Sequence, residues 1–151
     1  MLRRVAAACA LVALTGGCVG HPVGPARDLE SFEAKAGTTA SSALSAVETV
    51  RLLARTTADG GAFGSYASIA ISEQEDALGG IRGTFLSIQP PPGATAAALR
   101  AELSDLLTRA FDDVGAVRIE VRRGHLDDLD DAAAPLHQDA DDLRALVAEL
   151  A

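Results

Sequence analysis

Apolar residues recur every three or four positions through three long stretches, 28–57, 62–89 and 95–123, and through a shorter stretch, 135–150. This is the period of an α-helix that buries one face. No alternating pattern typical of strands competes with it over a similar length. The sequence therefore predicts an all-α fold with three long helices and one shorter C-terminal helix.

Residues that end or begin helices separate the four stretches. Gly60 and Gly61 follow the first stretch, and the Pro-Pro-Pro-Gly run at 90–93 stops the second, because a proline nitrogen has no hydrogen to donate. Gly124 follows the third, where a left-handed residue commonly closes a helix. Pro135 suits the first position of the fourth.

Short connections between long helices favour antiparallel neighbours, so we expect an up-down-up-down helical bundle. Each helix contributes one apolar seam to the core. The predicted seams are Phe32, Ala36, Thr39, Ala43, Ala46, Val50 and Leu53; Phe63, Ala67, Ala70, Ala77, Ile81, Phe85 and Ile88; Leu99, Leu103, Leu106, Ala110, Val114, Val117 and Val121; and Leu136, Ala140, Leu143, Val147 and Leu150.

The N-terminus carries a different pattern. Arg3 and Arg4 precede an uncharged stretch, 5–14, and small residues then lead to Cys18. The uncharged stretch suits a signal peptide and is about half of the ~20 residues that a membrane-spanning helix needs. The pattern resembles the signal of bacterial lipoproteins, although Thr15 stands where that family prefers Leu, Val or Ile.

The resemblance covers residues 1–18 only. It implies cleavage just before Cys18 and attachment of fatty acids such as palmitate, through diacylglycerol, to the sulfur of Cys18, which would anchor the chain stably. The implied location is the extracytoplasmic face of the cell membrane. The chain then divides into a signal peptide (1–17), a lipidated cysteine with a Gly/Pro-rich tether (18–27) and the bundle (28–151). An ordinary secretory signal and a buried N-terminal helix are the alternatives.

The composition of the chain argues against nucleic acid as a binding partner. Loss of Arg3 and Arg4 with the signal peptide changes the formal charge from −8 to −10, and a chain this acidic is repelled by nucleic acid. Aromatic residues make up 3% of the chain, which argues against stacking platforms for bases. Frequent Ala, Arg, Asp and Gly are typical of a GC-rich genome such as that of an actinobacterium. The bundle resembles the small helical domains of uncharacterised bacterial lipoproteins.

The fourth helix is too short to cover the whole length of the third. One end of the bundle, the one that the tether enters, would therefore have three walls. We expect five side chains there to line an apolar groove near the membrane: Phe32, Phe85, Ile88, Leu99 and Leu103. Two alternatives remove the groove. The three long helices close over one another, or residues 125–134 extend the fourth helix.

A polar run, 72–76, interrupts the second seam. Gln74 lies four residues after Ala70, so we expect it to point inward beside Glu73, with Arg118 at a similar height on the third helix. Such a buried polar layer of Glu73, Gln74 and Arg118 usually fixes the register of helices. A ligand-binding or catalytic role for the layer is the alternative.

Motifs for catalysis are weak. His125 and His137 are not preceded by glutamate at the spacing of the Glu-x-x-His motif of di-metal bundles. His137 and Asp141 lie one turn apart near several aspartates, but a solvated acidic loop explains them better than a metal site does. No Gly-x-Ser-x-Gly elbow or phosphate loop is present. We predict no metal and no cofactor.

Three functions remain open. The favoured one is a non-enzymatic, membrane-anchored envelope lipoprotein that binds or positions another envelope component. The second is a binder of a small apolar ligand or lipid in the membrane-proximal groove. The third is a metal-dependent enzyme at the acidic, histidine-containing end.

Overall fold

The structure, a computed structural model, describes residues 24–151, and these residues form helices and no strand. Cys18, the predicted signal peptide and most of the predicted tether lie outside the described residues. The helices are α2 (Leu29–Ala58), α3 (Gly64–Ser87), α4 (Ala94–Arg123), the single turn α5 (Leu129–Ala132) and α6 (Pro135–Glu149). The prediction of an all-α fold is confirmed, with three long helices and a shorter C-terminal one.

Helix ends fall close to the residues that the sequence indicated. Asp28 caps α2 by accepting a hydrogen bond from the Ser31 amide at 2.8 Å, and this bond holds the pKa of the Asp28 carboxyl below its usual value. Gly124 follows α4 with φ +78°, a left-handed conformation that glycine adopts without steric cost. Pro135 occupies the first turn of α6.

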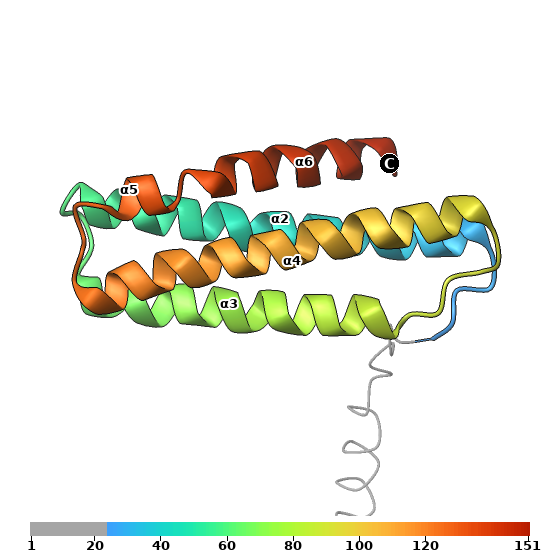
Figure 1. The fold of residues 1–151 in the computed structure, drawn as a ribbon, viewed down its shortest axis with the longest axis horizontal. Helices are drawn as coiled ribbons and strands as arrows, with labels where there is room; N and C mark the ends of the chain where they lie inside the picture. Colours follow the sequence, from blue (N-terminus) through green and yellow to red (C-terminus); the bar gives the residue numbers. More distant parts are fainter. Residues whose placement is uncertain (1–23) are drawn as a thin grey trace, which may run out of the picture.

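The four longer helices lie side by side (Figure 1). The connection between α2 and α3 lies at the same end as α5, and the connection between α3 and α4 lies at the other end. Both α3 and α6 pack against α2 and α4, so all four helices share one core. Because α6 has 15 residues and α4 has 30, α6 covers only part of α4.

The core seams follow the prediction closely on α4, where all seven predicted residues are buried. On α2, Ala40 is buried instead of Thr39. On α3, Ile71 and Leu78 are buried, whereas Ala70 and Ala77 are not. The α3 seam therefore runs one residue later than predicted in its middle, whereas Ala67, Phe85 and Ile88 are buried as predicted. Burying Ile71 and Leu78 removes more apolar area from water than burying the two alanines would.

Three glycines inside α3 do not interrupt the helix. A Cβ built on Gly79 would lie 3.3 Å from Cε2 of Phe111, so α3 and α4 approach closely there. The guanidinium of Arg82 also lies over the Phe111 ring, 4.7 Å from the ring centroid. Gly80 and Gly83 face open space. Only Gly79 therefore permits a close contact between the helices.

The first described residues lie against the bundle. Ala26 is buried, and its amide donates a hydrogen bond to the Gln89 carbonyl at 3.3 Å. Lys35 Nζ donates to the Gly24 carbonyl at 2.6 Å. Residues 24–27, the part of the predicted tether that the structure describes, thus form no helix but contact the bundle through Gly24 and Ala26. Nowhere between residues 24 and 151 does a helix combine the length and apolarity needed to span a membrane.

Candidate functional site

The five residues predicted to line a groove belong to the core. Their exposed fractions run from 0% at Phe32, Phe85 and Leu103 to 4% at Ile88 and 8% at Leu99. The rings of Phe32 and Phe85 stack with centroids 5.9 Å apart. These side chains fill the end of the bundle that α6 leaves uncovered, so α2, α3 and α4 close over one another. This arrangement corrects the prediction of an open groove lined by these five residues.

A shallow groove of about 400 Å³ does lie on the outer surface between α2 and α3. Ala34, Lys35 and Thr38 line it from α2, and Thr84 and the edge of Ile88 line it from the other side. Its lining is mostly the methyl and methylene groups of small side chains. The Lys35 amine that borders it also holds the Gly24 carbonyl, so the groove lies beside the start of the described chain.

The polar layer between α3 and α4 forms around a different glutamate. Arg118 donates through Nε and Nη2 to the two carboxylate oxygens of Glu75, the second at 3.3 Å. The two side chains are 22% and 15% exposed. Gly115 makes room for the carboxylate, since a Cβ there would lie 3.3 Å from Glu75 Oε1. This pair holds α3 to α4.

Glu73 and Gln74, the other predicted members of the layer, are exposed and half-buried respectively, and no hydrogen bond between either side chain and Arg118 is found. Arg118 thus contacts α3 through Glu75, and not through the predicted Glu73 and Gln74. The one-residue shift of the α3 seam explains the difference, because it brings Glu75 to the flank that faces α4.

A second polar contact, which the sequence analysis missed, joins α4 to α6. It comprises Arg109 and Asp113 of α4 and Asp139 and Asp142 of α6, and we call it the acidic contact. Asp139 is only 3% exposed. Its Oδ1 lies 3.8 Å from Arg109 Nε, and its Oδ2 has no hydrogen-bond partner among the described residues. Arg109 donates its shorter bond, 2.7 Å, to Asp142.

This environment favours the neutral form of Asp139. Burial, and then the neighbouring Asp113 carboxyl, raise the pKa of Asp139 from its ordinary 3.8 to about 6, although Arg109 acts in the opposite direction. Asp142 differs because its carboxylate accepts hydrogen bonds from Arg109 and Gln138, which lower its pKa. In mildly acidic solution, below about pH 6, Asp139 is therefore mostly protonated while Asp142 is ionised.

A chain of ion pairs joins α2 to α6. Glu48 accepts hydrogen bonds from Arg51 at 2.8 Å and from Arg144 at 2.6 Å. Arg51 Nη2 lies 2.5 Å from Nδ1 of His137, and Arg144 also pairs with Asp141 at 2.6 Å. These side chains are mostly near the surface, where each pair adds little free energy, but together they fix how α6 lies on α2.

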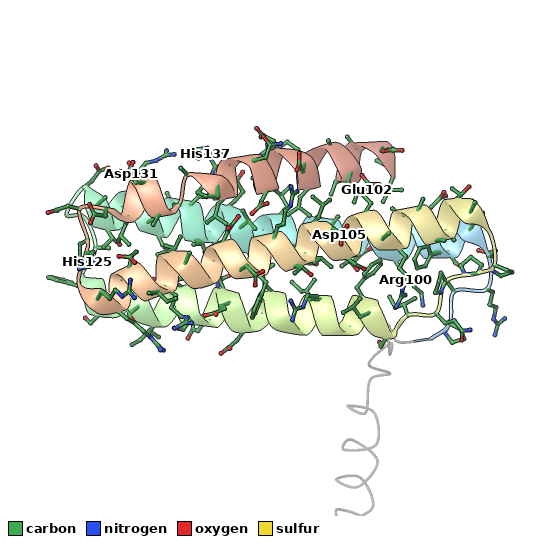
Figure 2. The ribbon with its side chains drawn as sticks, viewed as in Figure 1. Arg100, Glu102, Asp105, His125, Asp131 and His137 are labelled. Atoms are coloured by element: carbon green, nitrogen blue, oxygen red, sulfur yellow. The ribbon has the colours of Figure 1, made fainter. Side chains whose placement is uncertain are left out.

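The acidic and histidine-containing end shows no metal site within the described chain. Figure 2 shows His125 near the end of α4, Asp131 on α5 and His137 at the start of α6, on three separate elements. His125 pairs with Glu120 at 2.7 Å and His137 with Arg51. Across residues 24–151, no group of three or more potential metal-ligating side chains is found.

Three large apolar side chains are exposed together at the start of α3. Phe63, Tyr66 and Ile69 are 84%, 61% and 64% exposed and recur every three residues; we call them the apolar patch. The prediction had placed Phe63 in the core seam, which is wrong because Phe63 is the N-cap residue and the helical face begins only after it. The patch lies beside the α2–α3 connection, at the end of the bundle far from the α3–α4 connection (Figure 1).

Comparison with known proteins adds no family. The chain matches no protein-family model, no curated protein and no solved structure.

Proposed function

We propose that this chain is a lipid-anchored protein of a bacterial cell envelope, in which Cys18 carries the acyl chains and an up-down-up-down helical bundle binds or positions another envelope protein on the extracytoplasmic face. No reaction is assigned to it. The N-terminal pattern that ends at Cys18 supports the anchor, and the alternating ends of the helix connections support the topology (Figure 1).

The observation that carries the binding role is the apolar patch. The chain has four Phe, one Tyr and no Trp, and yet one Phe and the Tyr are exposed, at a spacing of three residues from each other and from Ile69. Exposed aromatic residues of this kind are enriched at protein interfaces. Because the full chain carries a formal charge of −8, and −10 without residues 1–17, we propose a partner with an apolar pocket and a basic rim.

The geometry would present this patch away from the membrane. Residues 24–26 are held at the carboxyl end of α3, and the patch lies at the amino end. The 24 residues of α3 separate the two ends by roughly 36 Å. An anchored Cys18 would be joined to residue 24 by only five intervening residues, which reach at most about 20 Å including both end bonds. The end that bears the α3–α4 connection would thus be proximal to the membrane.

Crosslinking in the native membrane tests the proposal. A photoreactive residue is placed at position 65, beside the patch, in the unmodified protein, in a variant with Phe63, Tyr66 and Ile69 all changed to Ser, and in a control with the exposed Leu86 changed to Ser. We expect one defined envelope protein to be crosslinked by the unmodified protein and by Leu86→Ser, and its yield to fall at least about tenfold in the patch variant. Equal yields in all three proteins would refute the patch as the binding surface.

The α2–α3 groove favours a second function, which is binding of a small apolar ligand or a lipid acyl chain. Its methyl-rich lining and its place beside residue 24 support this alternative. Mass spectrometry of a Cys18→Ala protein purified without detergent would show a bound lipid if the groove holds one. A Thr38→Glu, Thr84→Glu variant should lose that lipid, whereas the patch variant should keep it.

A further inference from the structure

The acidic contact places an incompletely paired carboxylate on the apolar face of α6. Asp139 lies between Leu136 and Leu143 on that face, and all three side chains are buried. With Oδ2 unpaired and Arg109 Nε 3.8 Å from Oδ1, an ionised Asp139 would hold a charge that its surroundings only partly compensate. A buried charge of that kind is unfavourable, and burying the neutral acid avoids the cost.

The charged groups around Asp139 can be named on every helix packed against α6. From α4 they are Arg109 and Asp113, and from α6 itself Asp142. Arg109 is also bound to Asp142, so its charge is shared between two carboxylates. The charged groups that α2 presents to α6 are Glu48 and Arg51, and these pair with Arg144 and His137 rather than with Asp139.

We propose that Asp139 keeps its proton while α6 is closed on α4 beside Asp113, and that release of this proton to solvent loosens α6 from α4. α6 would then act as a proton-controlled flap whose opening exposes its own apolar face. The proposal does not depend on the lipid anchor or on the apolar patch.

Two features support a local opening rather than general unfolding. α6 is the shortest of the four packed helices, and only a one-turn helix and short loops join it to α4. α2, α3 and α4 share core contacts that do not involve α6, including the stacked Phe32 and Phe85 rings. The raised pKa of Asp139, about 6, would place the transition between mildly acidic and neutral pH.

Hydrogen exchange of the protein as isolated from its host tests the flap. Amides of α6 are compared with those of α2, α3 and α4 at about pH 5 and about pH 7.5, after correction for intrinsic exchange rates. A shift from the ordinary pKa to about 6 predicts that α6 opens about tenfold more often at the higher pH. Protection of the other three helices should change much less.

Three variants test whether the proton, and no other effect of pH, controls the opening of α6. Asp139→Asn keeps a neutral donor at the contact, so α6 should stay protected at both pH values; Asp113→Asn should reduce the pH dependence. Asp112→Asn, at the exposed neighbouring position, should behave like the unmodified protein. Equal protection of α6 at both pH values in the unmodified protein, an unchanged pH dependence in Asp139→Asn, or a parallel loss in all four helices would each overturn the proposal.

A direct titration keeps the proposal testable if the Asn variants fail to fold. Carboxyl ¹³C NMR of the unmodified protein should show one aspartate resonance whose main titration step lies above about pH 5. The absence of any such step would overturn the proposal that Asp139 keeps its proton.

Discussion

At the scale of single residues, Arg100 secures the end of α3. Its guanidinium donates to the Leu86 carbonyl at 2.6 Å and to the Ile88 carbonyl, and Figure 2 shows it reaching from α4 toward this turn. The proline run that follows supplies no amide donors to these carbonyls. One side chain from α4 therefore satisfies acceptors at the end of α3 that the backbone leaves open.

We expect Arg100→Ala to lower the free energy of unfolding by about 1–2 kcal/mol, because two carbonyls lose a charged donor. Arg100→Lys should recover part of that loss, since an ammonium cannot span both carbonyls in the same way. Urea unfolding followed by circular dichroism measures the effect. Arg27→Ala, at an exposed position before α2, serves as the control and should change stability by less than about 0.5 kcal/mol. Equal stability of the Arg100 and Arg27 variants would contradict the assignment.

Asp139 predicts an unusual dependence of stability on pH. Its folded pKa, about 6, lies above the ordinary 3.8, so the folded state retains a proton that the unfolded state has lost. Asp139 therefore makes its full contribution to the free energy of unfolding below about pH 4, and this contribution is lost as the pH rises through about 6. Between about pH 5 and 7.5 the loss should be roughly 1.4 kcal/mol.

The difference in unfolding free energy between the unmodified protein and Asp139→Asn, measured across this range, isolates the contribution of Asp139. As the pH rises, Asp139→Asn should become increasingly more stable than the unmodified protein. Asp28, Glu120 and Asp142 have lowered pKa values, so their stabilising effects are lost only in more acidic solution and do not mask it. A difference that stays constant with pH would show that Asp139 is already ionised in the folded state.

At the scale of helices, α3 carries glycines that its packing does not need. Gly80 and Gly83 have open space around the position of a Cβ. Gly80→Ala and Gly83→Ala should each raise the free energy of unfolding by about 0.5–1 kcal/mol, because alanine reduces the backbone entropy of the unfolded chain. Gly79→Ala is the matched control, since its Cβ would meet Phe111 at 3.3 Å and the gain should shrink or reverse. Thermal melts of the three variants provide the comparison, and an equal gain at all three positions would be inconsistent with this packing.

The helices also show what the sequence could and could not predict. On α4, leucine and valine recur at regular spacing, and all seven predicted residues are buried, together with Ala96 and Leu107, which were not predicted. On α3, alanines at positions 70 and 77 fitted the period as well as Ile71 and Leu78 do, and only tertiary packing decided between them. Glycine and proline marked the helix ends because their effect is local.

Polar partners were harder to predict, for the same reason. Asp139 lies three residues after Leu136 and four before Leu143, so helical spacing does place it on the buried face. A charged residue there is normally assigned to the surface, and the sequence does not show that Asp113 approaches it from another helix. Arg118 was predicted to lie in a polar layer with Glu73. It pairs with Glu75 instead, because packing buries Ile71 and Leu78 and so turns Glu75 toward α4.

At the scale of the whole molecule, the proposed anchor on Cys18 would decide where the bundle works. If Cys18 is acylated, the protein should fractionate with membranes and be released only by detergent, and Cys18→Ser should make it soluble or leave it uncleaved. Membrane fractionation and intact mass spectrometry in the native host measure both results. A Cys9→Ser variant is the control and should be unaffected, since the implied cleavage removes residue 9. A mass that matches the unmodified chain would refute the anchor.

The exposure of Tyr66 has a practical consequence. The chain has one tyrosine and no tryptophan, and this tyrosine is 61% exposed within the apolar patch. Ultraviolet emission from the unlabelled protein therefore reports on a single surface position and is insensitive to the packed interior. Any molecule that covers the amino end of α3 should alter that emission, so the protein carries an intrinsic optical probe where we expect it to be recognised.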